Sequence, residues 1–261
     1  MDLGLTGRRA LVLGGNRGMG LAIASALAGE GAEIAIAARD PARLEAARAG
    51  LAKSGARVMA FPLDLGDTAG LTDFAASVTA RFGKPEILIN NTGGPPYGTA
   101  AGRSIDEWRT SFEEMTLSVI ALTDAFLPAM RAARWGRIVT IVSSGAVQPV
   151  PVLGISNALR SALIGWSKTL AGEVAAEGIT VNMLVPGRIA TERVYLTDQA
   201  AAERQGLDPA EVTRRSEATI PMGRYGQPEE VADMVTFLAS ARASYVTGSM
   251  VRVDGGIVRH V

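Results

Sequence analysis

Cysteine is absent from this 261-residue chain, and histidine occurs once, at His260. Without cysteine there is no disulfide, thiolate nucleophile, cysteine-ligated zinc or iron–sulfur cluster. A single histidine argues against a multi-histidine metal site and a Ser-His-Asp triad, so we expect no metal centre and assign His260 to a solvated tail. Any catalysis must therefore use Ser, Tyr, Lys, Arg, Asp, Glu or a bound cofactor.

An excess of charge and a long apolar run are also missing. The chain carries 26 basic and 26 acidic residues, which disfavours nucleic acid or an anionic membrane as the main partner. The opening MDLGLTGRRALVLGG has too short an apolar run for a signal peptide. No apolar stretch approaches the roughly 18–20 residues that span a bilayer. We expect a soluble, cytoplasmic protein with no membrane or nucleic-acid partner.

Apolar strand-like runs alternate along the chain with helical patterns. Most of these runs are continuous, as in parallel strands covered on both faces. This alternation predicts an α/β fold, a single Rossmann-like doubly wound parallel sheet of about seven strands over residues 1–261. A polar flap over about 188–226 follows the sixth strand. The expected strands are 10–14, 33–38, 57–64, 86–90, 137–143, 179–185 and 250–254, and the expected helices are 18–30, 41–53, 67–82, 104–132, 155–177 and 228–240.

A glycine-rich turn, GGNRGMG at 14–20, joins the first strand to the first helix. Glycines here let the backbone turn tightly and approach a pyrophosphate at the helix N-terminus, where free N–H groups and the helix dipole favour an anion. The turn therefore predicts a dinucleotide site. Its candidate cofactor-binding residues are Gly14, Asn16, Arg17, Gly18, Met19 and Gly20.

The end of the second strand favours NADP(H) over NAD(H). An NAD site usually presents Asp or Glu there to hold the ribose 2′-hydroxyl, but this strand ends in Ala37, Ala38 and Arg39. Arg17 lies in the glycine turn on the same side. Two guanidiniums and no carboxylate suit a 2′-phosphate, although either arginine could instead be a solvated surface charge.

Further motifs follow along nearly the whole chain. They are LDL (63–65), NNTGG (90–94), a helix opening at Trp108, RIVTIVSS (137–144), ITVNMLVPGRIAT (179–191), GRYGQPEEVA (223–232), YVTG (245–248) and VDGG (253–256). With the glycine turn, they resemble the short-chain dehydrogenase/reductase family, especially bacterial 3-oxoacyl-(acyl-carrier-protein) reductases. The resemblance implies one Rossmann-like domain, a small-molecule substrate and a homotetramer. That assembly is an analogy from fold.

The resemblance assigns cofactor roles to residues at the ends of three strands. Asp64 would bond the adenine and Leu65 would flank it. The ribose side would be lined by Asn91, Thr92 and Gly93. The nicotinamide carboxamide would be held by Pro186, Gly187, Ile189 and Thr191.

The family's catalytic set of Asn, Ser, Tyr and Lys is mostly replaced. Its Ser matches Ser143, but its Tyr and Lys positions hold Ser156 and Arg160, and its Asn position holds Met115. Lys168 falls outside the implied site. A serine hydroxyl is a far weaker acid than a phenol, and an arginine cannot release a proton near neutral pH. Arg160 can still hold the nicotinamide ribose and favour an oxyanion.

Loss of a placed proton donor typically costs about 10²–10⁴ in rate, so another group must substitute in an active reductase. Tyr97, after the fourth strand, is the first candidate, followed by Tyr195 in the flap and Glu114. Each could equally be a packing or surface residue. A water beside Ser143 and Ser156 is another source.

Arg188, in the sequence PGR, lies beside the expected nicotinamide end. There it could pair with an anionic substrate, or bond a flap carbonyl or an acid at the sheet edge.

Three functions remain open. The first is an NADP(H)-dependent oxidoreductase interconverting carbonyl and hydroxyl groups on a small 3-oxoacyl-like or other ketone substrate, with an altered proton path. The second is a non-catalytic NADP-binding protein, supported by the joint loss of Asn, Tyr and Lys. The third is a lyase resembling halohydrin dehalogenases, which Arg160 fits but the intact glycine turn does not.

Overall fold

Seven strands form one parallel sheet in a computed structural model that describes residues 1–260. The strand order is β3-β2-β1-β4-β5-β6-β7, and every neighbouring pair is parallel, which confirms the expected doubly wound sheet. The strands are β1 Arg9–Leu13, β2 Glu33–Ala38, β3 Val58–Pro62, β4 Ile87–Asn90, β5 Gly136–Ile141, β6 Ile179–Pro186 and β7 Met250–Val253.

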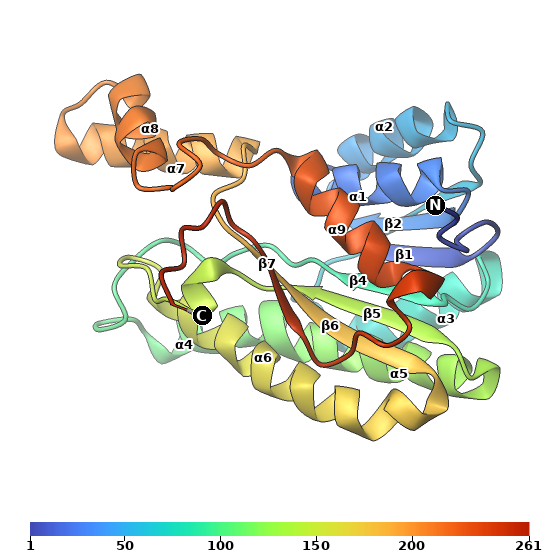
Figure 1. Cartoon of the computed structure of the whole chain (residues 1–261). Coiled ribbons are helices and arrows are strands. Elements are labelled where there is room, and N and C mark those ends of the chain that lie inside the picture. The colour runs from blue at the N-terminus through green and yellow to red at the C-terminus, as the bar shows by residue number, and fades with distance from the viewer. Residues whose placement is uncertain (261) are drawn as a thin grey trace.

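Helices cover both faces of this sheet (Figure 1). On one face, α1 (Gly18–Gly29), α2 (Pro41–Ala52) and α9 (Pro228–Ala239) pack into one apolar cluster with β1, β2 and β6. The other face is covered by α3 (Leu71–Arg81), α5 (Ser118–Ala133) and α6 (Gly154–Val174). Short 3₁₀ turns lie at Thr68–Gly70, Ser144–Ala146, Ala175–Glu177 and Ala241–Ala243.

Burial along the strands explains their continuous apolar runs. All residues of β4, β5 and β6 are buried, as expected where helices cover both faces of a parallel sheet. At the sheet edge, β7 alternates between exposed and half-buried residues. The sheet is therefore closed in its middle and open along β7.

Helix caps fix the starts of the outer helices. Asp40 accepts hydrogen bonds from the backbone of Ala42 and Arg43 at the start of α2. Ser104 and Glu107 form a capping box that starts α4 (Ile105–Phe112). By contrast, Arg17 at the start of α1 makes no side-chain cap, so the first N–H groups of α1 stay available to a ligand.

The helix expected over 104–132 is confirmed as a continuous helical stretch, Ile105–Ala133, with a π-helical distortion inside it. A π-helical segment, Glu113–Leu117, separates α4 from α5. Together these elements make a helical stretch, Ile105–Ala133, long and apolar enough to cross a membrane, so the expectation of no such stretch was wrong. Half of its most apolar window is buried inside the fold, as in a core helix of a globular domain.

The flap contains two helices, α7 (Glu192–Gln205) and α8 (Pro209–Glu217). They project beyond the carboxyl end of the sheet (Figure 1). A parallel bridge between Ile189 and Gly226 closes the base of this excursion, with Ala190 donating to the Gly226 carbonyl at 2.8 Å. The flap is thus a helical hairpin tied to the sheet at both ends.

Candidate active site

The carboxyl ends of β1, β4, β5 and β6 bring the predicted site residues to one edge of the sheet. Strand order reverses between β1 and β4, which is the topological switch point where ligands bind in open α/β sheets. The glycine turn follows β1, Asn91 follows β4, Ser143 follows β5 and Gly187 follows β6. The fold therefore gathers all four predicted segments.

The glycine turn is closed so tightly that its glycines cannot be replaced. Gly14 and Gly18 have φ values of +62° and +51°, which favour glycine. A Cβ on Gly20 would lie 2.7 Å from the Gly14 carbonyl carbon and 2.8 Å from the Asn91 amide nitrogen. Asn91 donates to the Leu13 carbonyl at 3.2 Å and so ties β4 to this turn.

This turn fits a dinucleotide pyrophosphate. Its glycines bring the backbone to the N-terminus of α1, where no side chain caps the free N–H groups. A buried hydroxyl, Thr92 Oγ1, has no hydrogen-bond partner among residues 1–260 and lies beside Gly93, where an added Cβ would meet open space. Uncapped backbone N–H groups can bind the phosphates of a dinucleotide, and the free Thr92 hydroxyl can bond its ribose.

Arginines gather beside the turn, on the side expected for a 2′-phosphate. Arg17 donates to the Glu192 carboxylate at 3.0 Å, and Arg43 donates to the same oxygen at 3.2 Å. These bonds, that from Arg17 first, lower the pKa of Glu192 below its usual range. Arg39 is exposed at the end of β2. The flap carboxylate therefore pairs with Arg17, one of the two cations expected to bind phosphate, and with Arg43.

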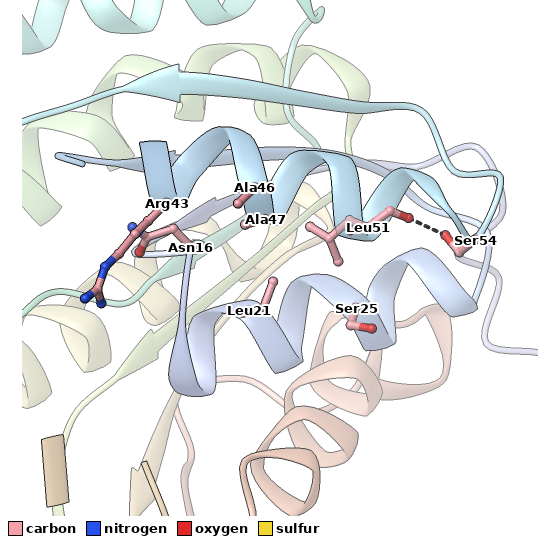
Figure 2. Close-up of a pocket in the computed structure, with 9 residues that line it drawn as sticks. Asn16, Leu21, Ser25, Arg43, Ala46, Ala47, Leu51 and Ser54 are labelled. Carbon is pink, nitrogen blue, oxygen red and sulfur yellow. Dashed lines mark hydrogen bonds between the residues drawn. The ribbon is translucent and has the colours of Figure 1, made fainter. Parts of the chain in front are cut away.

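A hollow of about 520 Å³ runs between α1 and α2, with Asn16 and Arg43 at one end and Ser25 and Ser54 towards the other (Figure 2). Figure 2 shows Asn16 and Arg43 together at one end, with Leu21 and Leu51 lining the apolar part. Arg43 was not among the predicted site residues. A basic residue three positions after the Asp40 cap is the signal that could have found it.

The remaining predicted cofactor residues lie along the same edge. Asp64 is exposed, and one of its oxygens accepts from the Gly66 N–H at 3.0 Å, while Leu65 packs against the core. After β6, the Gly187 N–H donates to the Val253 carbonyl at 2.9 Å. The Thr191 hydroxyl donates to the Ile189 carbonyl at 3.3 Å. Pro186 ends β6, and Met19 is half-buried in α1.

Three predicted catalytic residues come from β5 and α6. Ser143 Oγ accepts from the Gly145 N–H at 3.1 Å, which leaves its own hydrogen free to donate. Ser156 and Arg160 lie one turn apart on α6 and are each 9% exposed. Arg160 donates to the carbonyls of Ile141 at 2.8 Å and Gly93 at 3.1 Å.

Arg160 keeps its charge at neutral pH despite its burial. Desolvation first, and then the charge of Arg193, lowers the pKa of Arg160 to about 10. Two backbone carbonyls hold the guanidinium between β5 and the loop after β4. The site therefore presents a fixed cation, and no proton donor of the usual Tyr type, on this helix.

Met115 fills the implied asparagine position with apolar packing. It is 1% exposed and clusters with Ile155, Leu159 and Trp108. It lies in the π-helical segment, a distortion that occurs often at functional sites. A thioether packed among apolar side chains cannot anchor a relay water, as a carboxamide could.

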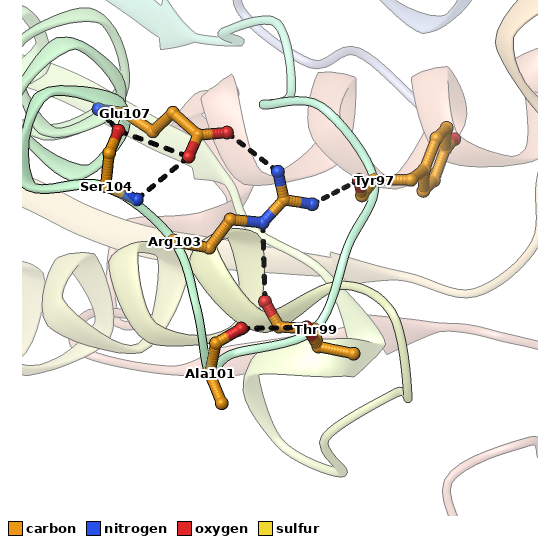
Figure 3. A network of polar contacts seen from close by, with 6 residues as sticks. All are labelled: Tyr97, Thr99, Ala101, Arg103, Ser104 and Glu107. Atoms are coloured by element: carbon orange, nitrogen blue, oxygen red, sulfur yellow. Dashed lines mark hydrogen bonds and ion pairs between the residues drawn. The ribbon is translucent and has the colours of Figure 1, made fainter.

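The Tyr97 side chain contacts the flap helix α7. Its hydroxyl hydrogen-bonds with Thr197 on α7, and the Arg193 guanidinium lies 5.5 Å from its ring centroid. Arg103 holds the Tyr97 carbonyl and also donates to Glu107 at 2.7 Å, as Figure 3 shows. The tyrosine therefore links the loop after β4 to α7.

The other two candidate donors lie elsewhere. Tyr195 is 52% exposed, and its ring centroid is 6.4 Å from that of Tyr225 within the flap. Glu114 approaches Gly66, because a Cβ on that glycine would lie 3.3 Å from Glu114 Cγ. Glu114 therefore lies beside the turn that follows β3.

Arg188 is occupied by an acid of the flap helix α7, which is none of the three partners expected for it. Its guanidinium bonds Asp198, which is 2% exposed and also accepts from the hydroxyls of Tyr225 at 2.6 Å and Thr213 at 3.1 Å. Arg188 therefore anchors the flap rather than offering a free cation to substrate.

Two residues that the sequence reasoning missed stand at the start of α7. Glu192 pairs with Arg17 and Arg43, and Arg193 lies over the loop after β4, donating to the carbonyls of Gly94 at 3.4 Å and Pro95 at 3.3 Å. The two charged residues directly after Thr191 were the available signal. The first turn of α7 thus contacts both the glycine turn and the loop after β4.

The sheet topology, the glycine turn and the exposed helix N-terminus define a dinucleotide-binding protein of the Rossmann class. A family model described as enoyl-(acyl carrier protein) reductase matches residues 14–258. The 3-oxoacyl-(acyl-carrier-protein) reductase of Escherichia coli K12 is 37% identical over 255 residues, covering 96% of this chain and 97% of that protein.

Solved structures agree with these sequence matches. L-sorbose reductase from Gluconobacter frateurii, crystallised with NADPH and L-sorbose, superposes with a TM-score of 0.95 at 35% identity, covering 100% of both chains. A short chain dehydrogenase/reductase family protein gives a TM-score of 0.83 at 34% identity, again over 100% of both chains. The chain belongs to the short-chain dehydrogenase/reductase family.

Proposed function

We propose that this protein is an NADP(H)-dependent oxidoreductase that interconverts carbonyl and hydroxyl groups on a small ketone-type substrate, 3-oxoacyl-like or other. The observation that carries this proposal is the juxtaposition of a closed glycine turn, flanked by arginines, with the Ser143–Ser156–Arg160 cluster at one sheet edge. A protein with no use for a nucleotide has no reason to keep that turn.

NADP(H) fits the cofactor half of the site. Arg17 and Arg43 already bind a carboxylate jointly, and Arg39 is free to reach a phosphate. The relatives solved with NADPH, among them L-sorbose reductase, support the same cofactor. When bound, NADP(H) donates or accepts the hydride.

The chain's own residues handle the carbonyl oxygen. Ser143 and Ser156 donate hydrogen bonds to it, and Arg160 stabilises the negative charge that develops there. Since no hydrogen bond occupies the Ser156 hydroxyl within residues 1–260, that group is free for this task. The proton comes from a water held by the two serines, because the guanidinium cannot release one at neutral pH.

A non-catalytic NADP-binding role is the second candidate. The burial of Met115 among Ile155, Leu159 and Trp108 favours it, because an apolar cluster stands where the family resemblance implies a relay water. The lyase alternative has less support, because the glycine turn is shaped for a pyrophosphate.

Stopped-flow loss of NADPH absorbance with a panel of ketones and 3-oxoacyl thioesters tests the proposal. The comparison is between the parent chain and a Ser156→Tyr, Arg160→Lys, Met115→Asn triple variant, after NADPH binding to both is confirmed. Parent turnover that collapses in Arg160→Ala supports a reductase with a rebuilt proton path. Tight NADPH binding without parent turnover, together with activity in the triple variant, supports the non-catalytic role.

We also propose a cytoplasmic homotetramer. The sheet edge at β7 is open, with Met250 48% exposed, and a second apolar face includes Phe112 and Leu117 on α4 and the π-helical segment. A hollow of about 640 Å³ beside β7 is lined in part by Met222 and Phe237. Two separate apolar surfaces are what a tetramer with twofold symmetry needs.

A further inference from the structure

A second guanidinium, that of Arg193, bonds the same loop as Arg160, and no acid within residues 1–260 pairs with either. Arg160 is held on the Gly93 carbonyl and Arg193 on the next one, that of Gly94. Neither forms an ion pair with any carboxylate within residues 1–260. Their charges are close enough that Arg193 lowers the pKa of Arg160.

This arrangement differs from that of the other buried arginine in the fold. Arg137 donates to three backbone carbonyls, those of Ser240, Gly136 and Gly178, and its guanidinium lies 4.5 Å from the Trp135 ring centroid. Arg137 therefore makes three hydrogen bonds to the protein and stacks on an aromatic ring. Arg160 donates to carbonyls with only two of the five N–H groups of its guanidinium. Three N–H groups therefore remain for a ligand.

Arg193 is positioned as part of the flap rather than as a free surface charge. The Gly94 backbone lies directly against it, because a Cβ on that glycine would lie 2.8 Å from Arg193 Cζ. The Tyr97 ring supports the guanidinium, and Thr197, one turn later on α7, bonds the Tyr97 hydroxyl. Arg193 is therefore held against the same loop that Arg160 bonds at the Gly93 carbonyl.

Arg160 is buried, and a buried guanidinium is expensive unless an anion neutralises it. Arg193 is exposed, but its nearby positive charge adds to that cost. We propose that Arg160 and Arg193 together bind the carboxylate of an anionic substrate, an oxo acid, with Arg193 as the specificity-determining residue. This inference rests on the proposed function for the carbonyl chemistry. It assigns the substrate anion to Arg193 rather than to Arg188, which already forms an ion pair with Asp198.

Acetoacetate and its methyl ester form a matched pair, because they share the ketone and differ in charge. We would measure KM for both, and the NADPH Kd, in the parent, Arg193→Gln, Arg193→Lys and Arg204→Gln. Arg204 lies on the same helix α7 and is exposed, so its substitution repeats the charge change away from the cleft. Arg193→Gln should raise KM for acetoacetate about tenfold and leave the ester and NADPH unchanged, while Arg193→Lys recovers part of the loss.

The proposal is overturned if Arg193→Gln weakens NADPH as much as acetoacetate, because the cation then serves the cofactor. Equal effects on acid and ester, or none on either, overturn it as well. If the parent reduces no ketone, calorimetric binding of malonate to the NADPH-loaded protein replaces KM. Arg193-dependent malonate binding then supports the anion site although the proposed reduction has failed, whereas absence of binding overturns the site itself.

Discussion

At the scale of single residues, this chain differs most from the family pattern at the positions that the resemblance assigns to catalysis. By the family resemblance, Ser156 and Arg160 stand on α6 where a phenol and an amine are expected, and Met115 stands where a carboxamide is expected. The structure accommodates all three without disturbing the sheet. Arg160 bridges the Ile141 and Gly93 carbonyls, and Met115 joins an apolar cluster. The outcome is a site built to stabilise negative charge and poor in acids.

The pH dependence of turnover follows from that chemistry. Because the pKa of Arg160 is lowered to about 10, its guanidinium stays charged below that pH and loses its proton above it. We therefore expect kcat/KM to be flat between about pH 6 and about pH 9 and to fall as the pH rises through 10. A buffer-corrected pH profile measures this. A limb centred near neutral pH would instead identify a titrating acid that the account lacks.

Gly20→Ala tests the closeness of the glycine turn. The added methyl would meet the Gly14 backbone and the Asn91 amide, so we expect NADPH Kd to rise more than tenfold and the free energy of unfolding to fall by about 1–3 kcal/mol. Gly29→Ala, at the other end of α1, is the control, because its Cβ meets nothing within 4 Å. Titration by NADPH fluorescence and urea unfolding give both readouts. Normal NADPH affinity in Gly20→Ala would contradict the assigned role.

At the scale of helices and strands, the flap stands out because the first turn of α7 contacts two parts of the site. Glu192 bonds the two arginines beside the glycine turn, and Arg193 lies on the loop after β4. One helix start can therefore respond both to the cofactor and to the substrate.

Glu192→Gln should tighten NADPH binding. Its carboxylate, kept ionised by a lowered pKa, competes with a 2′-phosphate for Arg17 and Arg43. Because the contact is exposed, we expect the NADPH Kd to fall only about two- to fivefold, with NADH affinity unchanged. Glu203→Gln, an exposed acid on the same helix, is the control. Weaker NADPH binding in Glu192→Gln would mean that the carboxylate helps hold the cofactor.

The sheet and the glycine turn were predictable because their signals are local. Apolar runs such as those of β4 and β6 are buried throughout, and the glycines after β1 have conformations that other residues avoid. The π-helical segment Glu113–Leu117 was not predictable, since no glycine or proline marks it. Pro128, conversely, lies inside α5 without ending it.

The flap and its charge pairs needed the tertiary structure. α7 and α8 are polar and lack a continuous apolar run, although Asp208 before Pro209 is a helix-start signal. The bonds from Arg188 to Asp198 and from Arg17 to Glu192 join residues whose proximity only the fold decides. Sequence motifs located the candidate site, and only the structure separated free cations from paired ones.

At the scale of the whole molecule, the exposed apolar faces predict an assembly. Light scattering after size exclusion should give about four times the 27.1 kDa chain mass. Met250→Glu on the β7 edge and Leu117→Glu in the π-helical segment should each reduce the tetramer to dimers, because each places a charge in one apolar interface. A monomeric parent would contradict this assembly, and a tetramer in both variants would place the interfaces elsewhere.

The central claim is that the site transfers hydride although the usual proton donor is missing. The most direct measurement uses NADPH deuterated at C4 of the nicotinamide, a ketone that the parent chain reduces in the panel, and mass spectrometry of the product. We expect one deuterium in the carbinol product of the parent chain and no deuterated product from Arg160→Ala. Tight NADPH binding with no labelled product from any ketone of the panel would contradict the account and leave a nucleotide-binding protein without the reaction.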